Sequence, residues 1–141
     1  MVRTVLRLGV VLLAALGAVI GAGGTATAAP ELTVSVAAAR LLPGGMQVEL
    51  TGRYVCGPLA RGANGVVDLT LTQEIGPTSG TGYGYLFVTV CDGSAQGWSA
   101  IVDGVGGRFI RGRAEVVGSG YACGDDGCVF GRFGPTLVRI R

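Results

Sequence analysis

The segment MQVELTGRYVC, residues 46 to 56, alternates between apolar and polar side chains and decides the fold class. Its apolar positions are Met46, Val48, Leu50, Tyr54 and Cys56, and its polar positions are Gln47, Glu49, Thr51 and Arg53. Successive side chains of a β-strand point to opposite faces, so the pattern predicts a strand with one buried face and one face in water.

Similar short segments follow along the chain, and 27 glycines help to divide it into pieces of strand length. Strands are predicted at residues 32–36, 66–74, 85–91, 97–104, 108–118 and 136–141, with turn residues between them. About seven short strands at regular spacing predict an all-β fold. We expect a single immunoglobulin-like antiparallel β-sandwich over residues 29–141.

For two of these segments the sequence also predicts which side chains face the core. The run YLFVTVC, residues 85–91, is apolar on both faces, which predicts a central strand covered on both sides after a flexible connection at residues 76–84. In RFIRGRAEVVG, residues 108–118, the alternation places Ile110, Ala114 and Val116 toward the core.

The N-terminal residues are typical of a secretory signal peptide. Arg3 and Arg7 precede an apolar run at residues 8–24, and Ala26 and Ala28 fit the small residues before a cleavage site. Cleavage after Ala28 makes residues 1–28 the signal peptide. The run is nearly long enough for an uncleaved membrane anchor, but no charged stop-transfer cluster follows it. We therefore expect a secreted, extracellular protein without a stable membrane anchor after cleavage.

The charged residues limit the chemistry. All 11 basic residues are arginine, and the chain has no lysine and no histidine. Their absence removes Ser–His and Cys–His nucleophile pairs, imidazole bases and Schiff-base lysines. Without the two signal-peptide arginines, 9 arginines balance 9 acidic residues. A neutral domain without a basic stripe is a poor match for nucleic acid or an anionic membrane surface.

Carboxylate-only catalysis is the remaining enzymatic alternative. Asp68, Glu74, Asp92 and Asp103 offer carboxylates, but most of them fall at predicted outward or turn positions. We expect no enzymatic activity, no cofactor and no metal.

The four cysteines predict two disulfides in an exported chain. Three connectivities are possible. Cys123 and Cys128 are separated by GDDG, which suits a bridge across a hairpin tip, and Cys56 then pairs with Cys91 by elimination. A zinc site is the alternative, but it favours two close pairs of ligands and only one is present. The turn at Asp92 and Gly93 leads back to Trp98, which we expect to pack near the Cys56–Cys91 bridge.

Aromatic residues provide the candidate binding site. Tyr83, Tyr85 and Phe87 recur with period two, which is typical of one face of a sheet. With Trp98 they are also the candidates to line a ligand cleft.

The motifs LTGRYVC, VVDLTLTQ and VTVCDGSAQGWSAIV, followed by two further cysteines, resemble a family of small secreted actinobacterial proteins that form a domain of unknown function. The resemblance implies an immunoglobulin-like fold and export, but no activity. In its size, export and two-disulfide layout the chain is also similar to the neocarzinostatin-type apoproteins, which carry a small molecule in a cleft of a seven-stranded sandwich.

The expected function is therefore that of an exported non-enzymatic module with a binding or structural role and an extracellular partner. One alternative is a carrier of a small apolar ligand, as the second resemblance implies. Another is a protease inhibitor acting through residues 56–65, around Leu59 to Arg61.

Overall fold

The computed structural model describes residues 31–60 and 62–141, and the expected signal peptide lies outside this part of the chain. The strands are β1 Glu31–Leu41, β2 Gln47–Gly57, β3 Asn64–Ile75, β4 Thr78–Val88, β5 Ala95–Val105, β6 Gly112–Gly124 and β7 Gly127–Ile140. The all-β class and the seven strands are confirmed. Within the described residues, no helix is both long and apolar enough to cross a membrane.

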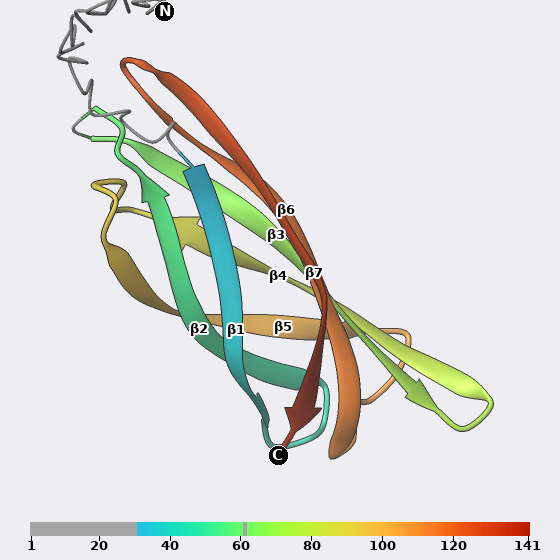
Figure 1. Ribbon diagram of the computed structural model, residues 1–141. Coiled ribbons are helices and arrows are strands. Elements are labelled where there is room, and N and C mark those ends of the chain that lie inside the picture. The colour runs from blue at the N-terminus through green and yellow to red at the C-terminus, as the bar shows by residue number, and fades with distance from the viewer. Residues whose placement is uncertain (1–30, 61) are drawn as a thin grey trace, which may run out of the picture.

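The strands close into a barrel in the order β1-β2-β5-β4-β3-β6-β7 (Figure 1). Neighbours are antiparallel except β1 and β7, which are parallel and share a single pair, Ala39 with Ile140. The seam between β4 and β5 is also short, with residues 81–84 facing residues 102–105. The closed barrel differs from the expected sandwich of two separate sheets, because strand pairing continues across both seams and leaves no free edge there.

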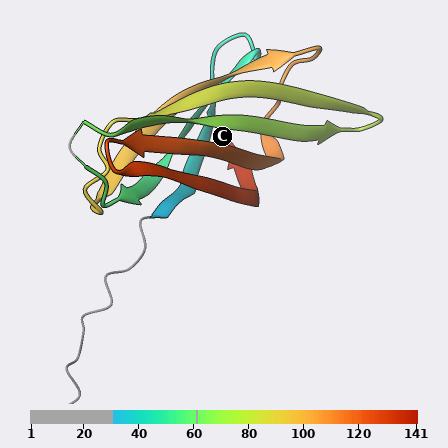
Figure 2. The ribbon, with the colours of Figure 1, turned by 90° about the horizontal axis from the view of Figure 1, so that it is seen from above.

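The β3–β4 hairpin is longer than the rest of the barrel wall. Its two strands pair from Gly65 with Val88 to Ile75 with Thr78. Both views show its tip projecting beyond the neighbouring strands (Figures 1 and 2). Residues 76–84, which we expected to be a flexible connection, are therefore mostly the first half of β4.

The barrel interior holds the core. The alternation of β2 is confirmed, since Val48, Leu50, Tyr54 and Cys56 are buried, while Met46 precedes the strand and is exposed. The end of the barrel that holds the C-terminal residue of β7 is filled by Phe109, from the loop between β5 and β6. A Cβ added at Gly82 would lie 2.9 Å from Cζ of this ring, so the glycines of β4 make room for it.

Two expectations about strand faces are wrong. The segment 85–91 is not covered on both sides, because Tyr85 and Phe87 of β4 are exposed on the outer surface. A single closed layer of strands has one interior, and no other described element covers its outside. Ile110 is exposed and Phe109 is buried, since β6 begins only at Gly112 and the loop before it follows no strand alternation.

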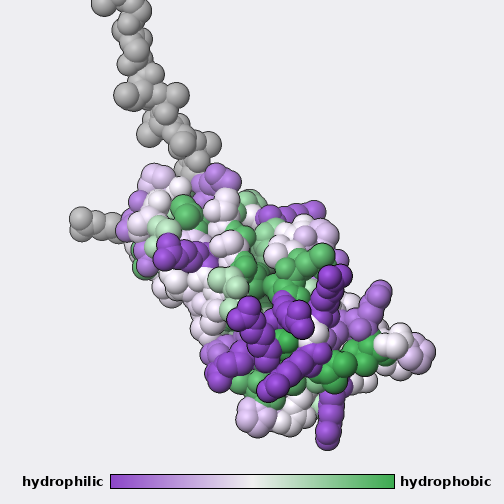
Figure 3. Space-filling view, turned by 60° about the horizontal axis from the view of Figure 1, so that its bottom comes forward, coloured by the Kyte–Doolittle hydropathy of each residue, from purple (hydrophilic) through white to green (hydrophobic). Residues whose placement is uncertain are grey.

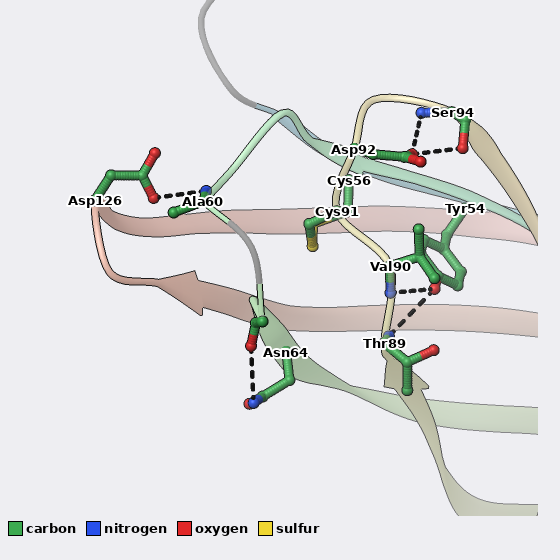
Figure 4. The surroundings of a disulfide bond; sticks show 11 residues. Tyr54, Cys56, Ala60, Asn64, Thr89, Val90, Cys91, Asp92, Ser94 and Asp126 are labelled. Carbon is green, nitrogen blue, oxygen red and sulfur yellow. Dashed lines mark hydrogen bonds between the residues drawn. A yellow bond between two sulfur atoms is a disulfide. The ribbon is translucent and has the colours of Figure 1, made fainter.

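Both expected disulfides are present, Cys56–Cys91 and Cys123–Cys128. The first joins the end of β2 to the β4–β5 loop, and the second closes the β6–β7 turn. Hydrogen bonds hold the loops of this end together. Leu59 N donates to Cys91 O at 2.8 Å, and Ala60 N donates to Oδ1 of Asp126 at 3.0 Å (Figure 4). We call this end of the barrel the disulfide end.

Trp98 lies on β5 opposite Gly52 of β2, and its side chain is 8% exposed. A Cβ at Gly52 would overlap the backbone carbonyl of Ser35 and approach Cε2 of Trp98 to 3.0 Å, so the glycine makes room for both the neighbouring strand and the indole. Tyr54 occupies the inward position between Gly52 and Cys56. Its hydroxyl accepts the backbone N–H groups of Thr89 and Val90, each at 3.2 Å (Figure 4). The aromatic side chain that binds the segment before Cys91 is thus Tyr54.

Candidate binding face

Five of the nine aromatic side chains are exposed on the outer surface of β4, β6 and β7. They are Tyr83, Tyr85, Phe87, Tyr121 and Phe130, and we call them the aromatic face. The most exposed are Phe130 at 77% and Phe87 at 70%. Exposed apolar side chains that gather on one surface are typical of a binding site rather than of ordinary solvent-facing sheet.

Strand register brings this face together from distant parts of the chain. Val66 of β3 pairs with Phe87 of β4 on one side and with Tyr121 of β6 on the other. Tyr121 in turn pairs with Phe130 of β7. The ring centroids of Tyr121 and Phe130 are 6.4 Å apart with the planes tilted by 46°, within the range of favourable aromatic pairs. The result is one continuous apolar row across four strands.

A polar row runs beside the apolar one. Tyr85, Asp68, Ser119 and Arg132 occupy successive strands in the same register. Ser119 is the smallest side chain of the four, so the surface is hollowed above it between the longer Asp68 and Arg132. No ion pair joins Asp68 to Arg132 in the described part of the chain, which leaves the groups of both side chains open to a ligand.

The hollow over this row has a volume of about 570 Å³. It is lined by Asp68, Ser119, Gly120, Tyr121, Phe130, Gly131 and Arg132. A second hollow of about 330 Å³ shares Asp68, Ser119 and Arg132 with it and continues toward Phe133. The face therefore combines aromatic walls with a small number of polar groups, the combination found in small-molecule sites.

The predicted site residues divide between two surfaces. Tyr83, Tyr85 and Phe87 lie together on the outside of β4, whereas Trp98 lies in the interior among core residues. The four do not line one cleft. Phe130 and Tyr121 were missed, although the sequence contained a signal: a hairpin that pairs Cys123 with Cys128 also places Tyr121 opposite Phe130.

Two carboxyl groups away from this face have a lowered pKa. Hydrogen bonds from Arg40 and then from Ser99 lower the pKa of Glu49. The hydroxyl and then the backbone N–H of Ser94 lower the pKa of Asp92. Both effects are those expected of donors that favour a carboxylate in exposed positions. The first hydrogen bonds join β1 and β5 to β2, and the second set stabilises the turn after Asp92.

Two alternatives from the sequence, a metal site and an inhibitory loop, concern other parts of the chain. Among the described residues, no group of three or more His, Cys, Asp or Glu side chains is placed to hold a metal ion. The proposed inhibitory segment includes Arg61, which lies outside the described residues. Comparisons with protein-family models, with curated proteins and with solved structures found no match.

Proposed function

We propose that the protein is an exported, non-enzymatic binding module that carries a small, largely apolar molecule on its aromatic face. The observation that carries this proposal is the row of exposed aromatic side chains beside a hollow of about 570 Å³. The hollow is shallow and open to solvent, but its volume and its mixture of apolar walls with a few polar groups fall within the range of small-molecule sites, which is about 300–1,000 Å³.

The proposed ligand site lies on the outer surface of the barrel, whereas the sequence predicted a cleft inside a sandwich. The interior positions of β2, β3 and β5 are filled by buried side chains such as Leu50, Leu69 and Val102. Outside, Asp68 and Arg132 flank Ser119 and supply a hydrogen-bond acceptor and a donor beside the aromatic row. A flat molecule with a polar or anionic group suits this arrangement, because its ring stacks on Tyr121 or Phe130 while the polar group meets Arg132.

Two further features support an exported immunoglobulin-like module. Both disulfides are compatible with an extracellular protein. The two short seams of the barrel, between β4 and β5 and between β1 and β7, separate a group of three strands from a group of four. This grouping supports a flattened barrel in which the three strands and the four strands face each other like the two sheets of a sandwich.

The test uses the naphthalene sulfonate dye ANS as a probe, because it has an apolar ring system and one anionic group. Fluorescence titration is expected to show saturable binding at one site per chain. The double substitution Tyr121→Ser and Phe130→Ser is expected to weaken the dye about tenfold or more, since it removes two aromatic walls. Ile101→Ser is the control, because Ile101 is an exposed apolar residue on β5, outside the aromatic face.

A second measurement looks for the natural ligand. Native mass spectrometry of protein recovered from its own host is expected to show a bound molecule that the double variant lacks. The proposal fails if the wild-type protein carries none and if the dye binds the double variant as tightly as the wild type.

A further inference from the structure

The end of the barrel opposite the disulfide end gathers arginine side chains from separate segments. Arg108 and Arg111 lie in the β5–β6 loop, Arg113 lies near the start of β6, and Arg139 and Arg141 lie at the end of β7. Figure 3 shows this end with elongated hydrophilic side chains grouped around an apolar area. We call these five residues the arginine end.

Strand register places like charges directly opposite one another. Arg113 pairs with Arg139 across β6 and β7. A hollow of about 430 Å³ is lined by Arg111, Arg139 and Arg141, with Gly112 and Ile140 between them. Like charges at directly opposed positions of a sheet destabilise it, so this arrangement favours a bound anion.

Acidic side chains do not neutralise these arginines by contact. The only ion pair between described residues joins Arg40 to Glu49 on the wall of β1 and β2. Glu74 and Glu115 line a separate hollow with Arg113, and both belong to strands. Arg108, Arg111 and Arg141, by contrast, lie outside the strands, and none of the three lines that hollow.

Apolar side chains are exposed on loops of the same end. Val105 is 60% exposed at the end of β5, Ile110 is 50% exposed in the following loop, and Met46 is exposed before β2. Hydrogen bonds fix these loops: Gly104 N donates to Met46 O at 2.7 Å, and the Gln73 side chain bonds both the N–H and the C=O of Ile110 at 2.9 Å. These exposed apolar side chains therefore lie on segments that are already ordered, so a partner would bind them with little loss of conformational entropy.

We propose that the arginine end docks on the surface of an anionic phospholipid bilayer. The guanidinium groups contact lipid phosphates, for which their planar geometry and charge are well suited. Val105 and Ile110 enter the headgroup region between them. This surface is separate from the aromatic face, and the disulfide end, with Asp92, Asp125 and Asp126, would point away from the membrane.

Sedimentation with lipid vesicles tests the proposal. A chain that begins at residue 29 avoids the apolar N-terminal run and keeps every strand, both disulfides and the whole described core. It is expected to bind vesicles of phosphatidylcholine with about 30% phosphatidylglycerol at least tenfold more tightly than pure phosphatidylcholine, and added salt should weaken the binding.

Matched variants separate the two contributions. Arg111→Gln with Arg139→Gln is expected to reduce binding about tenfold or more. Val105→Ser with Ile110→Ser is expected to reduce it severalfold without a change of charge. The control Arg53→Gln, matched to the single variant Arg111→Gln, removes one positive charge from β2 and is expected to change binding less than threefold. Circular dichroism checks that each variant is folded.

Four results would overturn the proposal. Equal binding to neutral and anionic vesicles excludes a role for the arginines. Equal losses of binding in Arg53→Gln and in Arg111→Gln mean that net charge alone explains the effect. If inorganic pyrophosphate binds saturably through Arg111 and Arg139 and vesicles do not bind, the site is one for a free phosphate compound. If duplex DNA binds as tightly as the anionic vesicles, the attraction to polyanions is unselective.

Discussion

The substitution Phe109→Ala should remove the side chain that fills one end of the barrel. Phe109 is 2% exposed, and its ring lies where a Cβ at Gly82 or Gly104 would come within 2.9 or 3.3 Å of it. A buried phenylalanine removes about 150–200 Å² from water, which at about 25 cal/mol/Å² corresponds to about 4–5 kcal/mol. The glycines around the cavity have no side chain that could fill the space, so we expect a loss of about 3–5 kcal/mol in the free energy of unfolding.

Urea denaturation with both disulfides intact measures this loss, and the fluorescence of Trp98, the only tryptophan, reports the transition. Ile110→Ala is the matched control, because Ile110 is the next residue but is 50% exposed, and we expect a change of about 0.5 kcal/mol or less. If Phe109→Ala does not fold, Phe109→Leu is expected to lose about 1–2 kcal/mol and remain measurable. Equal losses at the two positions, or a larger loss at Ile110, would refute the assignment of Phe109 to the core.

Three further predictions concern the disulfide end and the barrel wall. Replacing the Cys56–Cys91 bridge by two alanines should cost about 4 kcal/mol and replacing Cys123–Cys128 about 2 kcal/mol, because the bridges close segments with separations of 35 and 5 residues; urea denaturation that showed equal costs would contradict this. Tyr54→Phe should cost about 1–3 kcal/mol in the same assay, since two backbone N–H groups lose their acceptor. Glu49 has a pKa lowered below its ordinary value of 4.5, chiefly by the hydrogen bond from Arg40, so its contribution is present above pH 4.5 and is lost as the pH falls through the lowered pKa. Glu49→Gln should therefore flatten the acid side of a plot of denaturation midpoint against pH, and an unchanged plot would argue against the hydrogen-bonded carboxylate.

The parts of the fold that depend on local alternation could be predicted from the sequence. The faces of β2 follow from its period of two, and the pairing of Cys56 with Cys91 follows from the hairpin that uses the other two cysteines. The position of Phe109 could not be predicted in this way. It lies in a loop, where side-chain direction follows no fixed period, and the space it fills is created by glycines on β4 and β5.

The exposed outer face of β4 also could not be predicted from the sequence pattern. Tyr85 and Phe87 are residue types that are common in buried strands. The alternation of side chains along a strand does not distinguish a covered face from an apolar binding face. The distinction depends on whether another layer packs outside the strand, which is a property of the whole topology. In a single closed barrel no such layer exists among the described residues, so the same aromatic residues become a surface.

Net charge shows the same limit most clearly, because it is a sum along the chain whereas an electrostatic potential depends on position. Arg111 and Arg139 are far apart in sequence, and no basic stripe connects them. The antiparallel pairing of β6 and β7 makes their strand ends neighbours and places Arg113 opposite Arg139. The aspartates of the β4–β5 loop and of the β6–β7 turn lie at the other end of the barrel. A domain whose charges cancel in the sum can therefore still gather arginines at one end, and vesicle binding decides between the proposed docking and the expectation from net charge.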